Sequence, residues 1–139
     1  MTTETEFLDS LTFDPGEQMT SDFFKQNFSG RVWLKMLSLT PACPIGNVTF
    51  EPGCINNWHE HEGGQTLLVT AGRGWYQEWG KPARELKPGD VVDIPAHVKH
   101  WHGAATDSWF SHFSVEVDAE KGPAKWLEPV DRAEYDKLP

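Results

Sequence analysis

The chain of 139 residues is poor in cysteine and has no long apolar run, and each shortage excludes a class of protein. Cys43 and Cys54 form neither a CxxC pair nor a disulfide framework, so we expect both thiols to be reduced. No apolar stretch approaches the roughly 20 residues of a transmembrane helix, so we expect no membrane partner. Residues 1–10 are polar and acidic, without the basic start and apolar block of a signal peptide, and we therefore expect a cytoplasmic protein.

Basic residues are also scarce, because 12 Lys and Arg stand against 21 Asp and Glu, for a formal net charge of −9. Binding to nucleic acid needs Lys and Arg clustered on one face, so this balance argues against a nucleic-acid partner. An acidic surface favours solubility and says little about a substrate. With 38% hydrophobic and 24% charged residues, the chain has the composition of one folded domain.

From residue 31 onward, short β-rich runs alternate with turn residues at roughly the 8–12-residue spacing of an all-β sandwich or barrel. The predicted strands are 32–39, 47–50, 57–61, 65–70, 74–79, 84–86, 91–94, 100–104 and 109–117. Helix is expected only as one turn at 21–27 and a short C-terminal helix at 131–137, with Asp131 near its N-cap. The predicted fold class is therefore all-β with short helical termini.

The segment before residue 31 carries large hydrophobic side chains in a polar background, namely Phe7, Leu11, Phe13, Phe23, Phe24 and Phe28. A tail of this composition is expected to pack against a surface. We predict an N-terminal arm at residues 1–30, which packs on the barrel or on a partner subunit, and one domain at residues 31–139. Covering a sheet edge in this way prevents open-ended strand pairing.

A cluster of histidines predicts a metal centre. His59 and His61 are two residues apart on an extended segment, so they point to the same face, with Cα atoms roughly 6–7 Å apart. Two such imidazoles can bind one ion at about 2.0–2.1 Å. Gln65 follows a Glu-Gly-Gly turn that can return it beside the pair, and His100 arrives from a second hairpin. Three imidazoles and an amide oxygen would form a mixed nitrogen and oxygen site with room for a ligand.

The spacing of these residues resembles the two cupin motifs. In the first motif, five, one, three and six residues separate Gly53, His59, His61, Gln65 and Gly72. In the second, five residues separate Gly89 from Pro95, and His100 follows. A narrower resemblance, over roughly residues 31–117, is to small bacterial cupins that include the manganese-dependent hydroxynitrile lyases. It is carried by residues 48–53, 58–59, 64–67, 69–72, 74–75, 88–92 and 99–105.

The resemblance implies a cupin double-stranded β-helix, a jelly-roll barrel whose mouth holds one small ligand. It implies one divalent transition metal per chain, held by His59, His61, Gln65 and His100, and it favours Mn over Zn, Ni or Fe. It also implies a homodimer. Most cupins carry Glu at the position of Gln65, whereas the lyases carry Gln there. A neutral ligand set leaves the ion its full charge and makes it a stronger Lewis acid.

Two further histidines are candidates for proton transfer. His102 lies two residues after His100, so it faces the same side of an extended strand. His112 shares one face of its strand with Ser114 and Glu116, and buried polar groups of this kind need partners that a metal cavity supplies. The alternative is a solvent-facing His112. This residue also aligns with a histidine that the cupin lyases use near the substrate, and a pKa near neutrality would suit acid–base work.

Tryptophan side chains next to the predicted ligands are expected to pack rather than bind substrate. Trp58 and Trp101 each flank a ligand and should point to the opposite face of their strands. Trp75 and Trp79 share one face, which we predict to be core.

Three functions remain open for a small-molecule substrate. The first is a carbon–carbon lyase similar to the hydroxynitrile lyases, with the metal as Lewis acid and His112, together with His102, as acid and base. Glu116 stands where those lyases carry a neutral Gln, and a carboxylate would make binding of cyanide in the cavity less favourable. The second is a cupin oxygenase, which needs a redox-active ion with open positions. The third is a non-catalytic cupin that binds a metal or a ligand.

Overall fold

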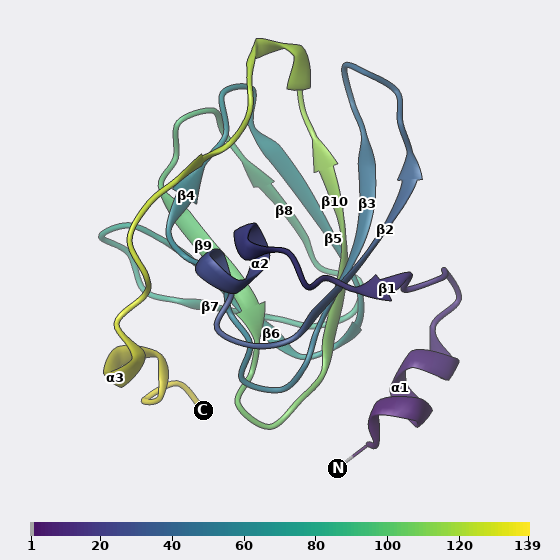
Figure 1. Ribbon diagram of the computed structural model, residues 1–139. Helices are drawn as coiled ribbons and strands as arrows, with labels where there is room; N and C mark the ends of the chain where they lie inside the picture. The colour runs from purple at the N-terminus through teal and green to yellow at the C-terminus, as the bar shows by residue number, and fades with distance from the viewer. Residues whose placement is uncertain (1) are drawn as a thin grey trace.

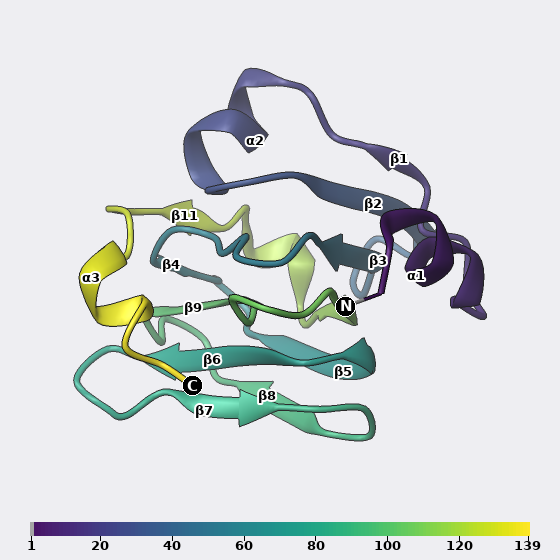
Figure 2. The same cartoon turned by 90° about the horizontal axis from the view of Figure 1, so that it is seen from below.

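Two antiparallel β-sheets pack face to face in the computed structural model, which describes residues 2–139 (Figure 1). The first sheet has six strands in the order β1-β2-β3-β10-β5-β8, and the second has five in the order β11-β4-β9-β6-β7. Figure 2 shows the two layers from below, with β2 and β7 on opposite sides of the molecule. This architecture confirms the predicted all-β jelly-roll class.

The elements follow the predicted order, with some differences at their ends. The first sheet contains β1 (Glu17–Gln18), β2 (Val32–Ser38), β3 (Ile45–Phe50), β10 (Phe110–Glu116), β5 (Gln65–Gly72) and β8 (Val91–Ile94). The second contains β11 (Lys125–Trp126), β4 (His59–Glu60), β9 (His100–Ala104), β6 (Gly74–Glu78) and β7 (Arg84–Leu86). The helices are α1 (Glu4–Ser10), α2 (Asp22–Asn27), the 3₁₀ turn η1 (Ala119–Lys121) and α3 (Arg132–Tyr135).

The helices are all short, and four elements were not expected from the sequence, namely α1, β1, η1 and β11. Two-residue strands leave too little alternation to recognise, and α1 depends on its cap, where the Thr3 side chain accepts a hydrogen bond from the Glu6 amide. Within residues 2–139, no helix combines the length and apolar character needed to cross a bilayer.

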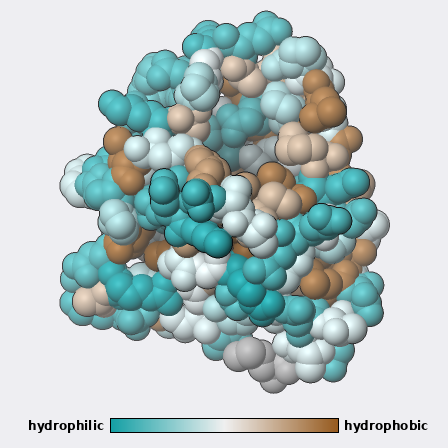
Figure 3. All heavy atoms as spheres, viewed as in Figure 1, coloured by the Kyte–Doolittle hydropathy of each residue, from teal (hydrophilic) through white to brown (hydrophobic). Residues whose placement is uncertain are grey.

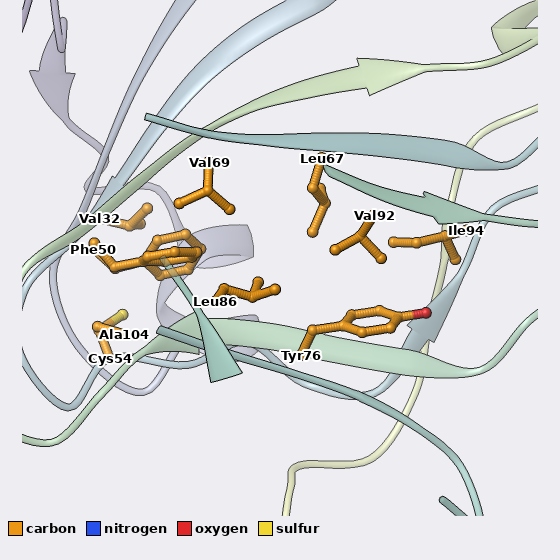
Figure 4. Close-up of a cluster of buried hydrophobic side chains, with 11 residues drawn as sticks. Val32, Phe50, Cys54, Leu67, Val69, Tyr76, Leu86, Val92, Ile94 and Ala104 are labelled. Atoms are coloured by element: carbon orange, nitrogen blue, oxygen red, sulfur yellow. The ribbon is translucent and has the colours of Figure 1, made fainter. Parts of the chain in front are cut away.

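The space between the sheets holds the main hydrophobic core (Figure 4). Leu67 and Val69 of β5 lie on one side of it, and Tyr76 and Leu86 of the second sheet lie on the other. Leu67 and Leu86 are completely buried. Burying one such side chain contributes roughly 1.5–3 kcal/mol to the free energy of folding, so this cluster stabilises the packing of the two sheets.

Each sheet also carries an aromatic cluster on its outer face, and a terminal segment covers it. On the first sheet, Trp33 and Trp109 pack with Phe7 of α1, whose ring stacks on Trp109 at 5.5 Å between centroids. On the second sheet, Trp101 packs with Tyr135 of α3. Trp58 and Trp75 belong to this second cluster, so the prediction that the tryptophans beside the ligands pack away from the site is confirmed.

The prediction that Trp79 is core is wrong, because this residue is 57% exposed. It follows the end of β6, where the strand alternation no longer sets its direction. Its ring packs edge-on against Trp58 at 4.9 Å, and Lys99 Nζ lies 3.6 Å from its centroid. The indole therefore forms a cation–π contact at the surface.

The N-terminal arm packs along the barrel of its own chain. In Figure 1, α2 crosses in front of the space between the sheets, while α1 lies beside the first sheet. Phe24 and Phe28, from α2 and its C-terminal end, pack against the core between the sheets. The arm therefore closes one end of the barrel, and its part in a homodimer stays a prediction.

Candidate metal centre and substrate cavity

Three histidines from neighbouring segments converge inside the barrel. His59 of β4 pairs in register with His100 of β9, and His61 follows two residues later. One ring nitrogen of each lies within 4.8 Å of the others, and all three residues are buried. The strand pairing therefore brings together histidines that the sequence placed in separate motifs and that were predicted as ligands.

Backbone carbonyls hold two of these rings. His59 Nδ1 lies 2.8 Å from the carbonyl oxygen of Asn57, and His100 Nδ1 lies 2.8 Å from that of Val98. A carbonyl only accepts, so each Nδ1 carries the proton and donates it. The Nε2 atoms are therefore left with free lone pairs, which is the usual arrangement of a metal-binding histidine.

Gln65 reaches the cluster through a tight turn. Gly64 has a φ of +100°, and a Cβ there would lie 2.8 Å from the carbonyl oxygen of Ile94, so only glycine fits this turn into β5. Gln65 Oε1 lies 3.4 Å from His100 Nε2. On the other side, Gln65 Nε2 donates to Ser114 Oγ at 2.6 Å. The amide oxygen thus faces the histidines.

The charge state and the unpartnered atoms of the cluster fit a divalent ion. Burial, reinforced by the neighbouring His100, lowers the pKa of His59 well below its usual value, and burial lowers the pKa of His100 to about 4. Both rings are therefore neutral near pH 7, as a metal ligand must be. His61 Nε2 is buried without a hydrogen-bond partner among residues 2–139. An unpartnered buried nitrogen is costly unless it has a ligand to bind.

Glu116 lies at the edge of the cluster, with its side chain 32% exposed. Its Oε2 is 3.0 Å from His61 Nδ1, although the ring is not aligned for a hydrogen bond in this structure. Its Oε1 is 3.5 Å from Gln65 Nε2. The one carboxylate therefore contacts two of the four predicted ligands.

A second pair of histidines lies deeper in the barrel. His112 Nε2 is 3.2 Å from His102 Nδ1, and both side chains are buried. In the described part of the chain, His112 Nδ1 has no hydrogen-bond partner. The solvent-facing alternative for His112 is therefore wrong. Burial lowers the pKa of His112 to about 4, so the expected pKa near neutrality is also wrong. Phe50 and Phe110 pack around the ring and provide this apolar setting.

His59 and His61 of the first group and both histidines of the second line one cavity of about 220 Å³. Its polar lining comes from Asn56, His59, His61, Gln65, His102, His112, Ser114 and Glu116. Its apolar lining includes Val48, Phe50, Phe23, Phe24, Phe28 and Trp126. A hollow flanked by hydrophobic side chains is visible near the centre of the face in Figure 3. Such a space suits a small molecule with an apolar body and one polar group.

Sequence reasoning missed two residues of the site. Asn56 Oδ1 accepts the backbone amide of His102 at 2.9 Å, and its Nδ2 lies 3.4 Å from His102 Nε2. Trp126 of β11 pairs with His59, and their rings stack at 4.2 Å. Asn56 lies three residues before His59, which is a weak signal, whereas nothing local connects Trp126 to the motifs. His97 stays outside the site, with its side chain 62% exposed.

Comparison with known proteins identifies the family. Residues 46–116 match the family of the cupin domain. The chain belongs to this cupin family. The predicted resemblance to the cupins is therefore confirmed, and the matched segment contains all four predicted metal ligands as well as His102 and His112.

One curated relative has a named activity. This cupin is 44% identical, over 96 residues, to a protein from Granulicella tundricola named (R)-mandelonitrile lyase. The alignment covers 68% of this chain and 73% of the relative.

Solved structures agree on the fold. A cupin-like protein from Thermotoga maritima is 46% identical, with a TM-score of 0.84, and the match covers 92% of this chain and 96% of that one. A DMSP lyase from Ruegeria pomeroyi has a TM-score of 0.60 at 18% identity, covering 82% of this chain and 58% of the other. At that identity the second likeness shows only a shared fold.

Proposed function

We propose that this cupin is a metal-dependent carbon–carbon lyase that cleaves and forms small hydroxynitriles. The observation that carries the proposal is that one cavity is lined by two members of the three-histidine cluster, His59 and His61, and by the buried His102–His112 pair. The first group can hold a Lewis acid, and the second can move a proton. The 44% identity to a mandelonitrile lyase supports this choice of reaction.

The proposed ligands are His59, His61, Gln65 and His100, and manganese is the proposed ion. When bound, a divalent ion would supply Lewis acidity toward the hydroxyl or carbonyl oxygen of the substrate. These ligands are three neutral imidazoles and one amide, so they do not cancel the charge of the ion. The site is buried, which strengthens electrostatic attraction to a developing negative charge.

The hydrogen bonds of Asn56 determine which ring nitrogens of His102 and His112 carry a proton. Because its Oδ1 accepts a backbone amide, its Nδ2 faces His102 Nε2, which must then be an acceptor. His102 Nδ1 therefore carries the proton and donates it to His112 Nε2 across 3.2 Å. The remaining proton of neutral His112 is on Nδ1, which has no other partner.

Cleavage then needs one proton to pass through the pair. The substrate hydroxyl gives its proton to His102 Nε2, which releases its hydrogen bond from Asn56 Nδ2, and the O–H electrons form the carbonyl double bond. The carbon–carbon bond breaks, and its electrons leave with cyanide. Cyanide takes the Nδ1 proton of His112, and the proton on His102 Nδ1 passes to His112 Nε2. The products are an aldehyde or ketone and hydrogen cyanide; neither histidine changes its charge, and each ends with its proton on the other ring nitrogen.

The aromatic lining orients the rest of the substrate. The ring of Trp126 contacts those of Phe23 and Phe28, at 5.3 and 5.8 Å between centroids, on the side of the cavity formed by α2 and β11. An apolar substituent can pack on these rings while its hydroxyl faces the histidines. This arrangement favours substrates with an aryl or bulky alkyl group.

Activity measured with defined metals tests the proposal. Protein purified without a histidine tag would be stripped, loaded with Mn, Zn, Ni or Fe, and assayed for benzaldehyde release from racemic mandelonitrile at mildly acidic pH. We expect release above that of free metal, and no oxygen uptake. A His59→Ala, His61→Ala double variant should lose the metal. Full metal occupancy in this variant, or no release by the loaded wild type, would refute the proposal.

The role of His112 has its own test. General acid–base catalysis typically contributes about 10²–10⁴-fold, so His112→Ala should lower kcat by that order. The metal should remain bound, because His112 is not one of its ligands. A wild-type rate in His112→Ala would remove this residue from the proton path.

A further inference from the structure

The carboxylate of Glu116 contacts two of the proposed metal ligands. The proposed metal centre and proton path assign no role to this residue. Its two oxygens face different groups: Oε2 lies 3.0 Å from His61 Nδ1, and Oε1 lies 3.5 Å from Gln65 Nε2. It ends β10 on the same face as His112 and Ser114, so the strand directs it into the cavity. The position is thus set by the fold.

We propose that Glu116 is a positioning residue that sets both the tautomer of His61 and the amide orientation of Gln65. This inference rests on the proposed metal centre. A carboxylate offers only acceptors, so the group facing each of its oxygens must be a donor. His61 must then carry its proton on Nδ1, which leaves the lone pair on Nε2 free for a metal ion.

The same argument applies to the amide. A side-chain amide presents either an oxygen or an NH₂ group, and the two ends have nearly the same shape. Ser114 can donate or accept, so its 2.6 Å hydrogen bond does not decide between the orientations. Glu116 does decide, because the NH₂ end must face its oxygen. Gln65 Oε1 is thereby turned toward His100 Nε2, at 3.4 Å, as a metal ligand requires.

An amide at position 116 could not replace the carboxylate. Glu116→Gln leaves one oxygen for two donors, so either His61 or Gln65 would face an NH₂ group. The His61 contact is not aligned as a hydrogen bond in this structure, and contacts of this kind commonly tighten when the ligand binds. Removing a partner behind a metal ligand typically lowers metal affinity about 10–100-fold.

A double-mutant cycle separates positioning from simple charge. In the wild-type background, Glu116→Gln should raise the Kd for Mn and Co about 10–100-fold, measured by competition with a chelating dye. With Gln65→Glu in place, position 65 has no amide to orient and its carboxylate lies next to that of Glu116. There Glu116→Gln should lower the Kd, because its NH₂ group can donate to the new carboxylate while its oxygen accepts from His61.

Glu62→Gln is the matched control, since it removes one carboxylate near the same ligands without touching them. Its side chain is 40% exposed, and its Oε2 lies 3.9 Å from Nε2 of the exposed His97. It should change the Kd little in either background. If Glu116→Gln weakens binding equally in both backgrounds, Glu116 acts only through its charge and the inference fails.

The tautomer of His61 gives a readout that needs no metal. Nitrogen-15 NMR of the metal-free protein should show His61 protonated on Nδ1 in the wild type and in Glu62→Gln, with this preference reduced in Glu116→Gln. A wild-type His61 protonated on Nε2 would overturn the inference. If the wild type binds no divalent ion, the proposed metal centre fails, while the NMR result still decides whether Glu116 orients His61.

Discussion

The buried His112 should make the stability of this cupin fall as the pH is lowered below 7. Its side chain is fully buried, and its ring packs against Phe50 and Phe110 at 5.6 and 5.5 Å between centroids. Burial lowers its pKa from 6.5 to about 4. Between these two values the unfolded chain binds a proton that the folded chain does not, so acid favours unfolding.

The size of the effect follows from the two pKa values. The pKa falls from 6.5 to about 4, and each pKa unit corresponds to about 1.36 kcal/mol. The contribution of His112 to the loss of unfolding free energy is therefore at most about 3 kcal/mol. Between pH 7 and pH 5 the loss from His112 should be about 2 kcal/mol. Below a pH of about 4 both states bind the proton, and this contribution should level off.

Urea unfolding at pH 7, 6 and 5 measures this loss, with a chelator present to keep metal from the folded protein. His112→Gln replaces the imidazole by a group that does not titrate in this range, so it should lose about 2 kcal/mol less than the wild type between pH 7 and 5. His97→Asn is the control, because His97 is exposed and its φ of 65° is tolerated by Asn. Equal losses in the wild type and His112→Gln would refute the argument.

Three other predictions concern the metal, the substrate and the assembly. Gln65→Glu should lower kcat with the metal still bound, because an anionic ligand reduces Lewis acidity; an unchanged kcat at saturating metal would show that charge at this position is irrelevant. Phe23→Ala should lower kcat/KM for mandelonitrile about 2–10-fold relative to acetone cyanohydrin, through loss of an aromatic contact; an equal fall for both would exclude selective packing. Sedimentation at tens of micromolar should show a dimer, and a monomer would leave the N-terminal arm with contacts to its own barrel alone.

The strands and the histidine cluster could be predicted because their signals are local. Strands 84–86, 91–94 and 100–104 have the predicted bounds, since turn residues flank each of them. Pairing of β4 with β9 then follows from the fold, and it brings His59 to His100.

Other parts of the site depend on contacts between distant segments. Trp126 lies on a two-residue strand after a Pro- and Gly-containing stretch, and only the folded chain stacks it on His59. Alternation placed Glu116 on the inner face, but the identity of its partners required the positions of His61 and Gln65 in space. The lowered pKa of His112 likewise comes from complete burial, which alternation alone does not measure.

The lining of the cavity has two origins along the chain. Every titratable or amide side chain in it lies within residues 46–116, the segment shared across the family. Phe23, Phe24, Phe28 and Trp126 come from flanking segments outside it. Under the proposed function, substitutions in these flanks can reshape the substrate range while the proposed reactive groups stay unchanged. Relatives with the same reactive groups and different flanks would then diverge in substrate before they diverge in chemistry.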